Sequence, residues 1–228
     1  MESVSIKDWW DRGGEVTTAV ITLLAVGAGG LLVRHSTLDL SVTYWANTHH
    51  TGLFGDLTTA VYLGLRSPGA VLLTAVTALL LSVCLRSCTR AVEFAATALA
   101  IWLPVMLIKP LFARPRPDPH ELAHPLPLNL VDYSYISGHT VFMTAFVLAL
   151  SLALRGTAAH QWVVWLGTVA VAGICVVVLT NGVHYPSDVA GALIWVVGTF
   201  PLFSRTVVFL MRRRVPQRVS AHSGVPSR

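Results

Sequence analysis

Six long apolar stretches, each with at most one charged residue, constrain the fold of this chain more than any other feature. They span residues 16–33, 70–85, 91–108, 140–154, 162–179 and 189–203. A helix of about 18 to 20 apolar residues can cross the roughly 30 Å hydrocarbon layer of a membrane. Inside lipid the backbone must satisfy its own hydrogen bonds, which favours helices. We therefore expect an all-α fold, a six-transmembrane helical bundle.

The composition agrees with a single integral membrane domain. Hydrophobic residues make up 54% of the 228 residues and charged residues only 12%, whereas soluble domains carry about 25% charged residues. We expect residues 1–15 to form an interfacial segment, residues 16–205 the helical bundle and residues 206–228 a basic cytoplasmic tail. The segment 34–66 is expected to lie outside the membrane and to be partly helical.

The distribution of basic residues predicts the orientation of the bundle. With both termini inside, eleven basic residues fall in inner segments and five in outer segments. The inner set is Lys7, Arg12, Arg86, Arg90, Arg155, Arg205, Arg212, Arg213, Arg214, Arg218 and Arg228, and the outer set is Arg34, Arg66, Lys109, Arg114 and Arg116. Cytoplasmic segments of membrane proteins are enriched in Lys and Arg. We therefore expect a plasma-membrane protein with cytoplasmic termini, and its net charge of +5 indicates contact with lipid head groups rather than nucleic acid.

Three polar segments fall on the predicted outer face. The first, residues 109–117, carries Lys109 and Arg116 on a proline-stiffened backbone. An ammonium and a guanidinium are the side-chain groups that bind phosphate oxygens best. The pair could clamp a phosphate, or it could cap a membrane span and contact lipid head groups.

The second polar segment is Ser137-Gly138-His139, directly before an apolar stretch. Free N–H groups at a helix start can hold an anion, and glycine lets that anion approach the backbone. His139 would then be placed to donate a proton to a leaving oxygen. Alternatively, Ser137 caps the helix and His139 lies at the membrane interface.

The third polar segment, residues 181–188, holds His184 four residues before Asp188. A carboxylate at a membrane boundary is costly, and one beside a histidine can orient the imidazole as a nucleophile. Asp188 could instead stabilise the dipole at the start of the last helix.

Together these segments resemble the motifs of the type 2 phosphatidic acid phosphatase superfamily, which also contains the vanadium haloperoxidases. The first family motif, Lys, six residues, Arg-Pro, is matched in full by Lys109 and Arg116-Pro117. The second, Pro-Ser-Gly-His, is matched by residues 137–139, with Ile136 in place of proline.

The third family motif is Ser-Arg, five residues, His, three residues, Asp. His184 and Asp188 match its second half, whereas Val177 and Val178 stand where the Ser-Arg pair would be. Arg114 is two residues from Arg116, but polyproline geometry would turn it in another direction, so we do not expect it to replace the missing arginine. A neutral donor could instead come from Asn181, from Tyr185 or from a lipid head-group partner.

The resemblance implies a phosphatase that acts through a phosphohistidine, with three catalytic residues and four phosphate-binding residues. His184 would be the nucleophile, Asp188 would orient it and His139 would protonate the leaving group. The phosphate-binding residues would be Lys109, Arg116, Ser137 and Gly138. The resemblance implies no metal and no other cofactor.

The expected substrate is a phosphorylated lipid, either a polyprenyl mono- or diphosphate or a phospholipid of the phosphatidic acid type, hydrolysed on the extracytoplasmic face. Two alternatives stay open. One is a phosphatase of a polyprenyl-linked cell-wall intermediate, and the other is a catalytically weakened member that binds or carries a phosphorylated lipid. The other expected partners are membrane lipids, and the sequence does not determine the oligomeric state.

Overall fold

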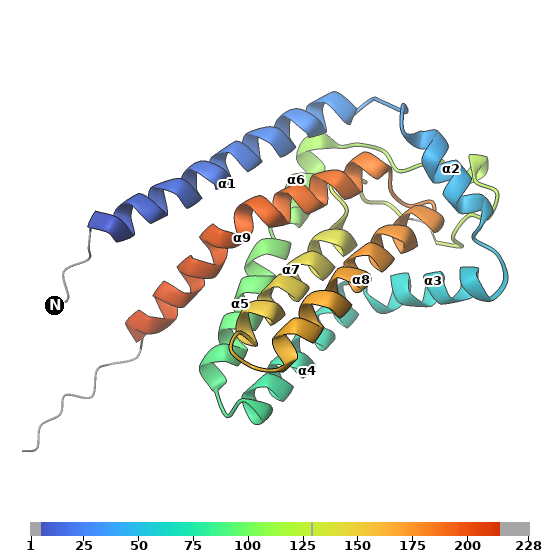
Figure 1. The fold of residues 1–228 in the computed structure, drawn as a ribbon. Helices are drawn as coiled ribbons and strands as arrows, with labels where there is room; N and C mark the ends of the chain where they lie inside the picture. Colours follow the sequence, from blue (N-terminus) through green and yellow to red (C-terminus); the bar gives the residue numbers. More distant parts are fainter. Residues whose placement is uncertain (1–5, 129, 215–228) are drawn as a thin grey trace, which may run out of the picture.

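Helices form all of the regular structure among the residues that the computed structural model describes, 6–128 and 130–214 (Figure 1). In chain order the elements are α1 (Ile6–Val33), α2 (Leu40–Thr48), α3 (Gly52–Gly64), α4 (Ser67–Cys84), α5 (Cys88–Trp102), α6 (Val105–Phe112), the short 3-10 helix η1 (Pro119–Glu121), α7 (Gly138–Ala153), α8 (Ala159–Thr180) and α9 (Pro186–Arg214).

Helix α7 lies at the centre of the bundle, where it packs against α5, α8 and α9. Its buried face alternates small residues such as Ala145 with aromatic residues such as Phe142. Small side chains let helices approach closely in a membrane protein. The Phe142 ring meets Trp102 of α5 at an angle, with 5.2 Å between ring centroids. This apolar centre holds the ends of α7, α8 and α9 in a fixed arrangement.

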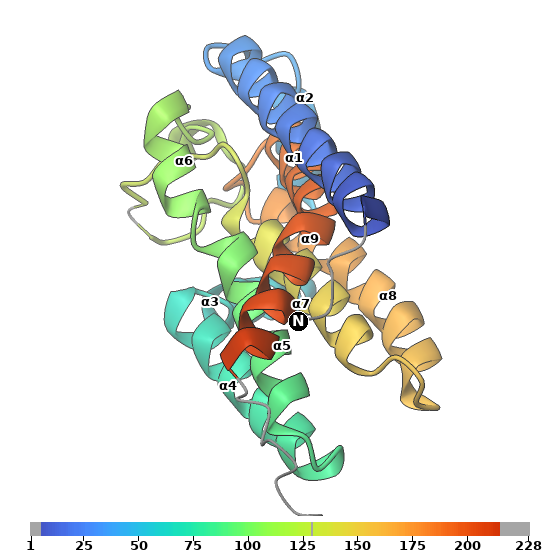
Figure 2. The same cartoon turned by 90° about the vertical axis from the view of Figure 1, so that its left-hand side faces the viewer.

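Helix α1 lies along α9 on the outside of the bundle (Figure 2). The close approach needs Gly198, because a Cβ atom there would lie 1.8 Å from Oγ1 of Thr22. Near the other end of this contact, Nε of Arg205 lies 2.6 Å from a carboxylate oxygen of Glu15. The first and last helices therefore pair along much of their length.

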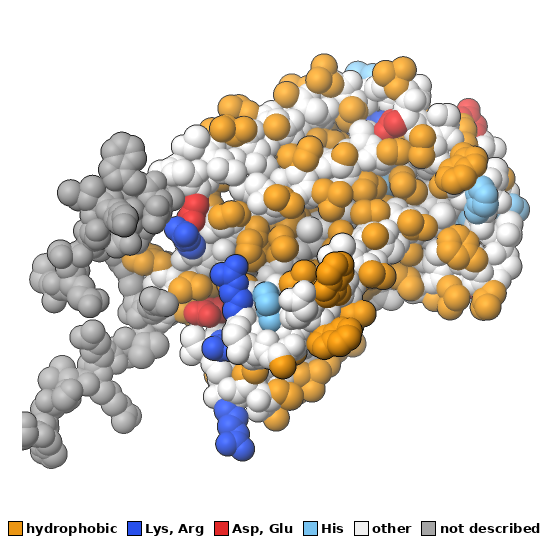
Figure 3. Space-filling view, viewed as in Figure 1, with side chains coloured by type: hydrophobic (Ala, Val, Ile, Leu, Met, Phe, Trp, Pro, Cys, Tyr) orange, Lys and Arg blue, Asp and Glu red, His pale blue; other side chains and the backbone are white. Residues whose placement is uncertain are grey.

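Five helical stretches of the described chain are long and apolar enough to cross a membrane: Gly13–Val33, Ser67–Cys84, Cys88–Phe112, Ala159–Thr180 and Pro186–Met211. Helix α7 is a shorter apolar helix of 16 residues. Apolar side chains are spread over the face of the bundle drawn in Figure 3. Leu24, Leu32, Leu79 and Val169 are each more than 60% exposed. Such surfaces suit contact with lipid. The predicted all-α bundle with six apolar helices is confirmed, and the chain is a multi-pass membrane protein.

Some boundaries differ from the prediction. The expected third span is two helices, because the chain breaks at Leu103 and Pro104 between α5 and α6. Pro110, expected to end that span, lies within α6. Helix α9 continues past residue 205 to Arg214, and α1 begins within the predicted interfacial segment, at Ile6. Residues 1–5 and 215–228, the ends of the predicted interfacial segment and tail, lie outside the described residues.

The three polar segments meet at one end of the bundle. The first turns of α7 and α9, the end of α8, helices α2 and α3 and the loop 113–137 all gather there (Figure 1). The opposite end carries the start of α1, the end of α9 and the loops that join α4 to α5 and α7 to α8. The fold thus separates a polar face from the face that holds both ends of the described chain.

Candidate active site

His184 lies in the tight connection between α8 and α9. Gly182 has a φ of +68°, and a Cβ atom there would lie 2.4 Å from Leu122, so the turn requires glycine. Oγ1 of Thr43 donates a hydrogen bond to the His184 carbonyl at 3.0 Å. These contacts bury the His184 side chain, which is 1% exposed.

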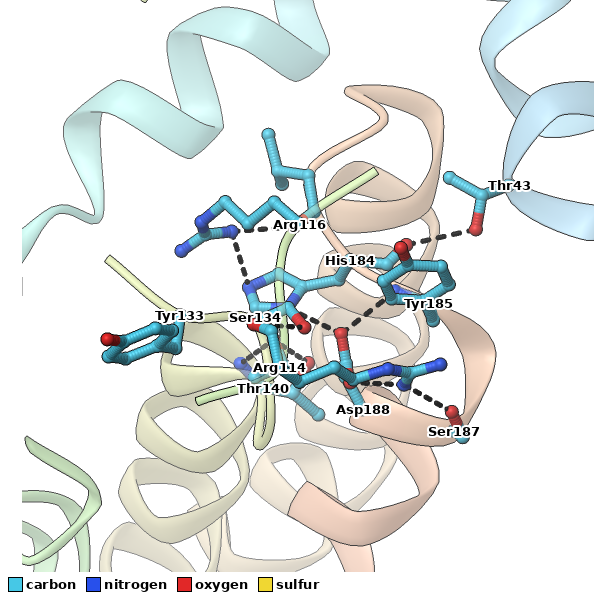
Figure 4. A network of polar contacts seen from close by, with 12 residues as sticks. Thr43, Arg114, Arg116, Tyr133, Ser134, Thr140, His184, Tyr185, Ser187 and Asp188 are labelled. Carbon is cyan, nitrogen blue, oxygen red and sulfur yellow. Dashed lines mark hydrogen bonds and ion pairs between the residues drawn. The ribbon is translucent and has the colours of Figure 1, made fainter. Parts of the chain in front are cut away.

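Asp188 fixes the orientation of the His184 ring (Figure 4). Its Oδ2 lies 3.2 Å from Nδ1 of His184 and also accepts a hydrogen bond from the backbone N–H of Tyr185 at 3.0 Å. An ionised carboxylate only accepts hydrogen bonds, so Nδ1 carries the proton. The other ring nitrogen, Nε2, is then left with its lone pair.

The Nε2 atom of His184 faces a cation. It lies 3.4 Å from Nη1 of Arg116, which also donates to the carbonyl of Val183 at 2.6 Å. Burial, followed by the charge of Arg116, lowers the pKa of His184 to about 3. The ring therefore stays neutral, and able to act as a nucleophile, well below neutral pH.

Lys109 and Arg116 converge on one carboxylate, that of Asp132. Lys109 Nζ donates to Oδ2 of Asp132 at 2.8 Å and to the carbonyl of Tyr133 at 2.8 Å. Arg116 contacts both Asp132 oxygens, at 2.8 and 3.0 Å through Nη2. Burial would raise the pKa of Asp132, but Arg116 and Lys109 outweigh it and hold that pKa at about 2. An ionised carboxylate thus occupies the place between the two cations that could hold a phosphate.

Arg114 points away from Arg116 and lies behind Asp188 (Figure 4). Its Nη1 donates to Oδ1 of Asp188 at 2.7 Å and its Nη2 to Oδ1 of Asp39 at 3.1 Å. The guanidinium also lies over the Tyr185 ring, 3.7 Å from its centre. Its side chain is 1% exposed. The predicted divergence of the two arginines is therefore present, and Arg114 supports Asp188 from the side opposite His184.

Ser137 and Gly138 start α7 in different ways. The Ser137 side chain is fully buried, and its Oγ accepts hydrogen bonds from the N–H and Oγ1 of Thr140 at 3.4 and 3.0 Å. It caps the helix, so its hydroxyl faces the protein rather than a cavity. A Cβ atom added at Gly138 would meet nothing within 4 Å. The backbone at Gly138 therefore has room for an anion beside it.

His139 lines the same cavity as Gly138, Lys109 and Arg116, a space of about 180 Å³. Its ring stacks on Tyr62 of α3, with 4.4 Å between centroids. Nε2 of His139 lies 3.0 Å from the Tyr62 carbonyl, which only accepts hydrogen bonds, so Nε2 carries a proton. Nδ1 is the ring nitrogen left for a substrate. Among the described residues, no three His, Cys, Asp or Glu side chains lie together as a metal site.

The sequence model of the PAP2 superfamily matches residues 69–212, well over half of the chain. The chain belongs to the PAP2 superfamily. Its fold is similar to the crystal structure of the first transmembrane PAP2 type phosphatidylglycerolphosphate phosphatase from Bacillus subtilis, with a TM-score of 0.68 and 15% sequence identity. The similarity covers 88% of this chain and 99% of that chain. No curated protein sequence matches this chain.

In this PAP2 protein, Val178 stands where the resemblance would place the arginine of the third motif. Val178 is fully buried in an apolar cluster with Tyr62, Val183 and Val189. The two neutral donors considered as replacements have different surroundings. Nδ2 of Asn181 donates to a backbone carbonyl of α8 at 2.8 Å, and the Tyr185 ring packs on Arg114.

Restoring the motif arginine in this PAP2 protein is expected to destabilise it. In Val178→Arg, a charge would enter an apolar cluster that offers no counter-ion, at a cost of about 3 kcal/mol or more. The midpoint of thermal unfolding in detergent should fall well below that of wild type. Val178→Ile, which adds one methylene, is the control and should cost about 1 kcal/mol. A Val178→Arg protein as stable as wild type and more active would contradict this account of the cluster.

Proposed function

We propose that this PAP2 protein is a phosphatase that removes phosphate from a phosphorylated membrane lipid, either a polyprenyl mono- or diphosphate or a phospholipid of the phosphatidic acid type. One observation carries the proposal. The unprotonated Nε2 of His184 faces Arg116, which with Lys109 forms a paired cation site. A neutral imidazole beside two phosphate-binding cations is suited to attack phosphorus.

In the first step, a substrate phosphate would replace the Asp132 carboxylate between Lys109 and Arg116. Nε2 of His184 would attack phosphorus, and the bond from phosphorus to the lipid oxygen would break. The two cations and the backbone N–H of Gly138 would stabilise the charge on the phosphoryl oxygens. Asp188 would stabilise the positive charge that develops on the His184 ring, since it already accepts the Nδ1 proton.

His139 would act on the leaving group. In its cationic form, with a proton on both ring nitrogens, it would donate the Nδ1 proton to the departing lipid oxygen and become neutral, while Nε2 keeps its bond to the Tyr62 carbonyl. In the second step, His139 would take a proton from water as that water attacks phosphorus. The P–N bond would break, releasing inorganic phosphate and restoring neutral His184.

A second cavity supports a lipid substrate. It measures about 340 Å³ and adjoins Arg116 and Asp132, and its wall is largely apolar. Leu122, Leu126, Leu128 and Val183 contribute to that wall. A phosphate held by the cations would have room for the apolar part of a lipid beside it. The polar face would lie on the outer side of the membrane, in keeping with the distribution of basic residues.

The function is tested by phosphate release from a panel of lipid phosphates that includes polyprenyl mono- and diphosphates, phosphatidic acid and phosphatidylglycerol phosphate. The purified protein in detergent should release phosphate from at least one of them. A polyprenyl-linked cell-wall intermediate is assayed separately as a further substrate. Tight binding of a phosphorylated lipid with no release would favour the binding or carrier alternative. Two features favour that alternative. Val178 stands where the family motif has an arginine, and the Asp132 carboxylate already occupies the site between the two cations.

Asp132→Asn is expected to strengthen phosphate binding. Asp132 competes with a phosphate for Lys109 and Arg116, and its removal as an anion leaves both cations free. Inhibition by inorganic phosphate should become about tenfold tighter, and KM for the lipid phosphate should fall by a similar factor. Asp56→Asn, at an exposed position of α3, is the control. If Asp132→Asn left both constants unchanged or weakened them, Asp132 would not be a competitor of phosphate.

A further inference from the structure

One arginine of the phosphate cavity has a side chain with no hydrogen-bond or ion-pair partner among the described residues. The cavity of about 180 Å³ is lined by Arg66 as well as by Lys109, Arg116 and His139. The Arg66 residue is exposed and directly precedes α4. Its side chain makes no hydrogen bond or ion pair with any residue in the described ranges 13–128 and 130–211, whereas Lys109 and Arg116 share Asp132.

Charge in the cavity is unbalanced as a result. Lys109, Arg116 and Arg66 contribute three positive charges to its wall, and Asp132 contributes one negative charge. Burial raises the pKa of Tyr62. The charges of Arg116 and Arg66 oppose this rise, and the charge of Asp132 adds to it. The excess positive charge suits a ligand with two or more negative charges, as a phosphate monoester or a diphosphate has.

Arg66 enters the cavity from a different segment than the motif arginine would. The Tyr62 side chain packs in the same cluster as Val178 and lines the cavity beside Arg66. Position 178 is sealed in that cluster, fully buried, whereas Arg66 reaches the cavity from the corner between α3 and α4. Arg66 also precedes the region 69–212 that the family model matches.

We propose that Arg66 binds the phosphate group of the substrate and supplies the guanidinium that the third motif lacks at Val178. This inference rests on the proposed phosphatase function. The ligand class is a phosphate monoester or diphosphate, attached to a lipid as substrate or free as product. Arg66 would contact the non-bridging oxygens together with Lys109 and Arg116 once Asp132 has been displaced.

Arg66→Ala tests the inference, because an exposed and unpaired side chain can be removed without disturbing the fold. A donor to the transition state is worth about 100-fold in rate, so kcat/KM should fall by about that factor. Inhibition by inorganic phosphate should weaken about tenfold or more. Arg66→Lys keeps the charge but loses the forked geometry of the guanidinium. Its kcat/KM and its inhibition by phosphate should lie between those of wild type and Arg66→Ala. The thermal midpoint should not change in either variant.

Arg155→Ala is the matched control, since Arg155 is also exposed but lies in the loop between α7 and α8, at the opposite end of the bundle. It should behave as wild type. Values of kcat/KM and phosphate inhibition within about threefold of wild type in Arg66→Ala would overturn the role of Arg66 and leave the phosphatase function standing.

A binding measurement tests the role of Arg66 even if the proposed phosphatase function is wrong. If the wild-type protein released no phosphate from any lipid, the rise in thermal midpoint with inorganic phosphate would still measure binding. A rise in wild type that is lost in Arg66→Ala supports the assignment of Arg66. An equal rise in both proteins, or no rise in either, overturns it.

Discussion

Replacing His184 with alanine is expected to abolish phosphate release, lowering kcat by at least about 10⁴-fold. Removal of a nucleophile leaves only the contributions of binding and of electrostatic stabilisation. The Asp188 carboxylate and Arg116 lie 3.2 and 3.4 Å from the two nitrogens of the His184 ring, which orients this ring for attack. The measurement is the initial rate of phosphate release from the best lipid phosphate of the panel.

The His184→Ala substitution should lower the rate of the chemical step without abolishing substrate binding. His184→Ala should retain binding of the lipid phosphate within about tenfold, since Lys109 and Arg116 remain in place. His49→Ala is a control at the same end of the bundle, because His49 is exposed and its ring bonds only to its own helix. Unchanged release after His184→Ala would contradict the assignment of the nucleophile.

Asp188→Asn is expected to lower kcat by about 10³ to 10⁴-fold. The carboxylate holds the Nδ1 proton of His184 and would stabilise the positive ring after attack, and an amide does neither reliably. Asp188 also pairs with the buried Arg114 at 2.7 Å. Leaving Arg114 with only Asp39 as a counter-ion should cost about 3 kcal/mol of stability. Both kcat and the thermal midpoint should therefore fall.

Asp39→Asn separates the two roles of this carboxylate network. Asp39 contacts Arg114 at 3.1 Å and the backbone N–H of Ser187 at 2.8 Å, but it does not contact His184. Its replacement should lower the thermal midpoint while reducing kcat by less than about tenfold. If Asp39→Asn lowered kcat as much as Asp188→Asn, the loss would reflect a disturbed fold rather than the orientation of His184.

Much of the fold follows from hydrophobic length and charge. The six apolar stretches predicted six helices in nearly the right places, because a membrane span needs both length and an absence of charge. The break at Leu103 and Pro104 was not predicted, since the apolar pattern runs through it. Helix α9 extends beyond its predicted end. Basic residues in its last turns interact favourably with the helix dipole and so do not end the helix.

The candidate site was predicted residue by residue but not as a network. The predicted membrane topology put Lys109, Arg116, His139 and His184 on one face. The structure places the first three around one cavity, with His184 beside Arg116. The contact of Asp132 with two cations depends on the path of a proline-rich loop that has no periodic pattern. Asp132 is one of three acidic residues in this outer segment, with Asp118 and Glu121, so the sequence did not single it out.

The surroundings of Asp188 also depend on long-range packing. Arg114 and Asp39 are 75 residues apart in sequence, and no local pattern predicts that they meet behind Asp188. Ser137 shows the reverse case, because its capping role follows from its place before a helix, whereas the family motif suggested a phosphate ligand. Arg66 could have been suspected only from its place among the five outer basic residues.

The proposed mechanism requires a phosphoryl group that is carried by His184. Incubation with a lipid phosphate labelled in its phosphoryl group, followed by an alkaline quench that preserves phosphohistidine, should place the label on the peptide that contains residues 181–188. The label should be absent from Asp188-containing peptides of His184→Ala and should decay at the rate of phosphate release. A protein that turns over with no label on His184, or with the label on His139, would contradict the proposed mechanism.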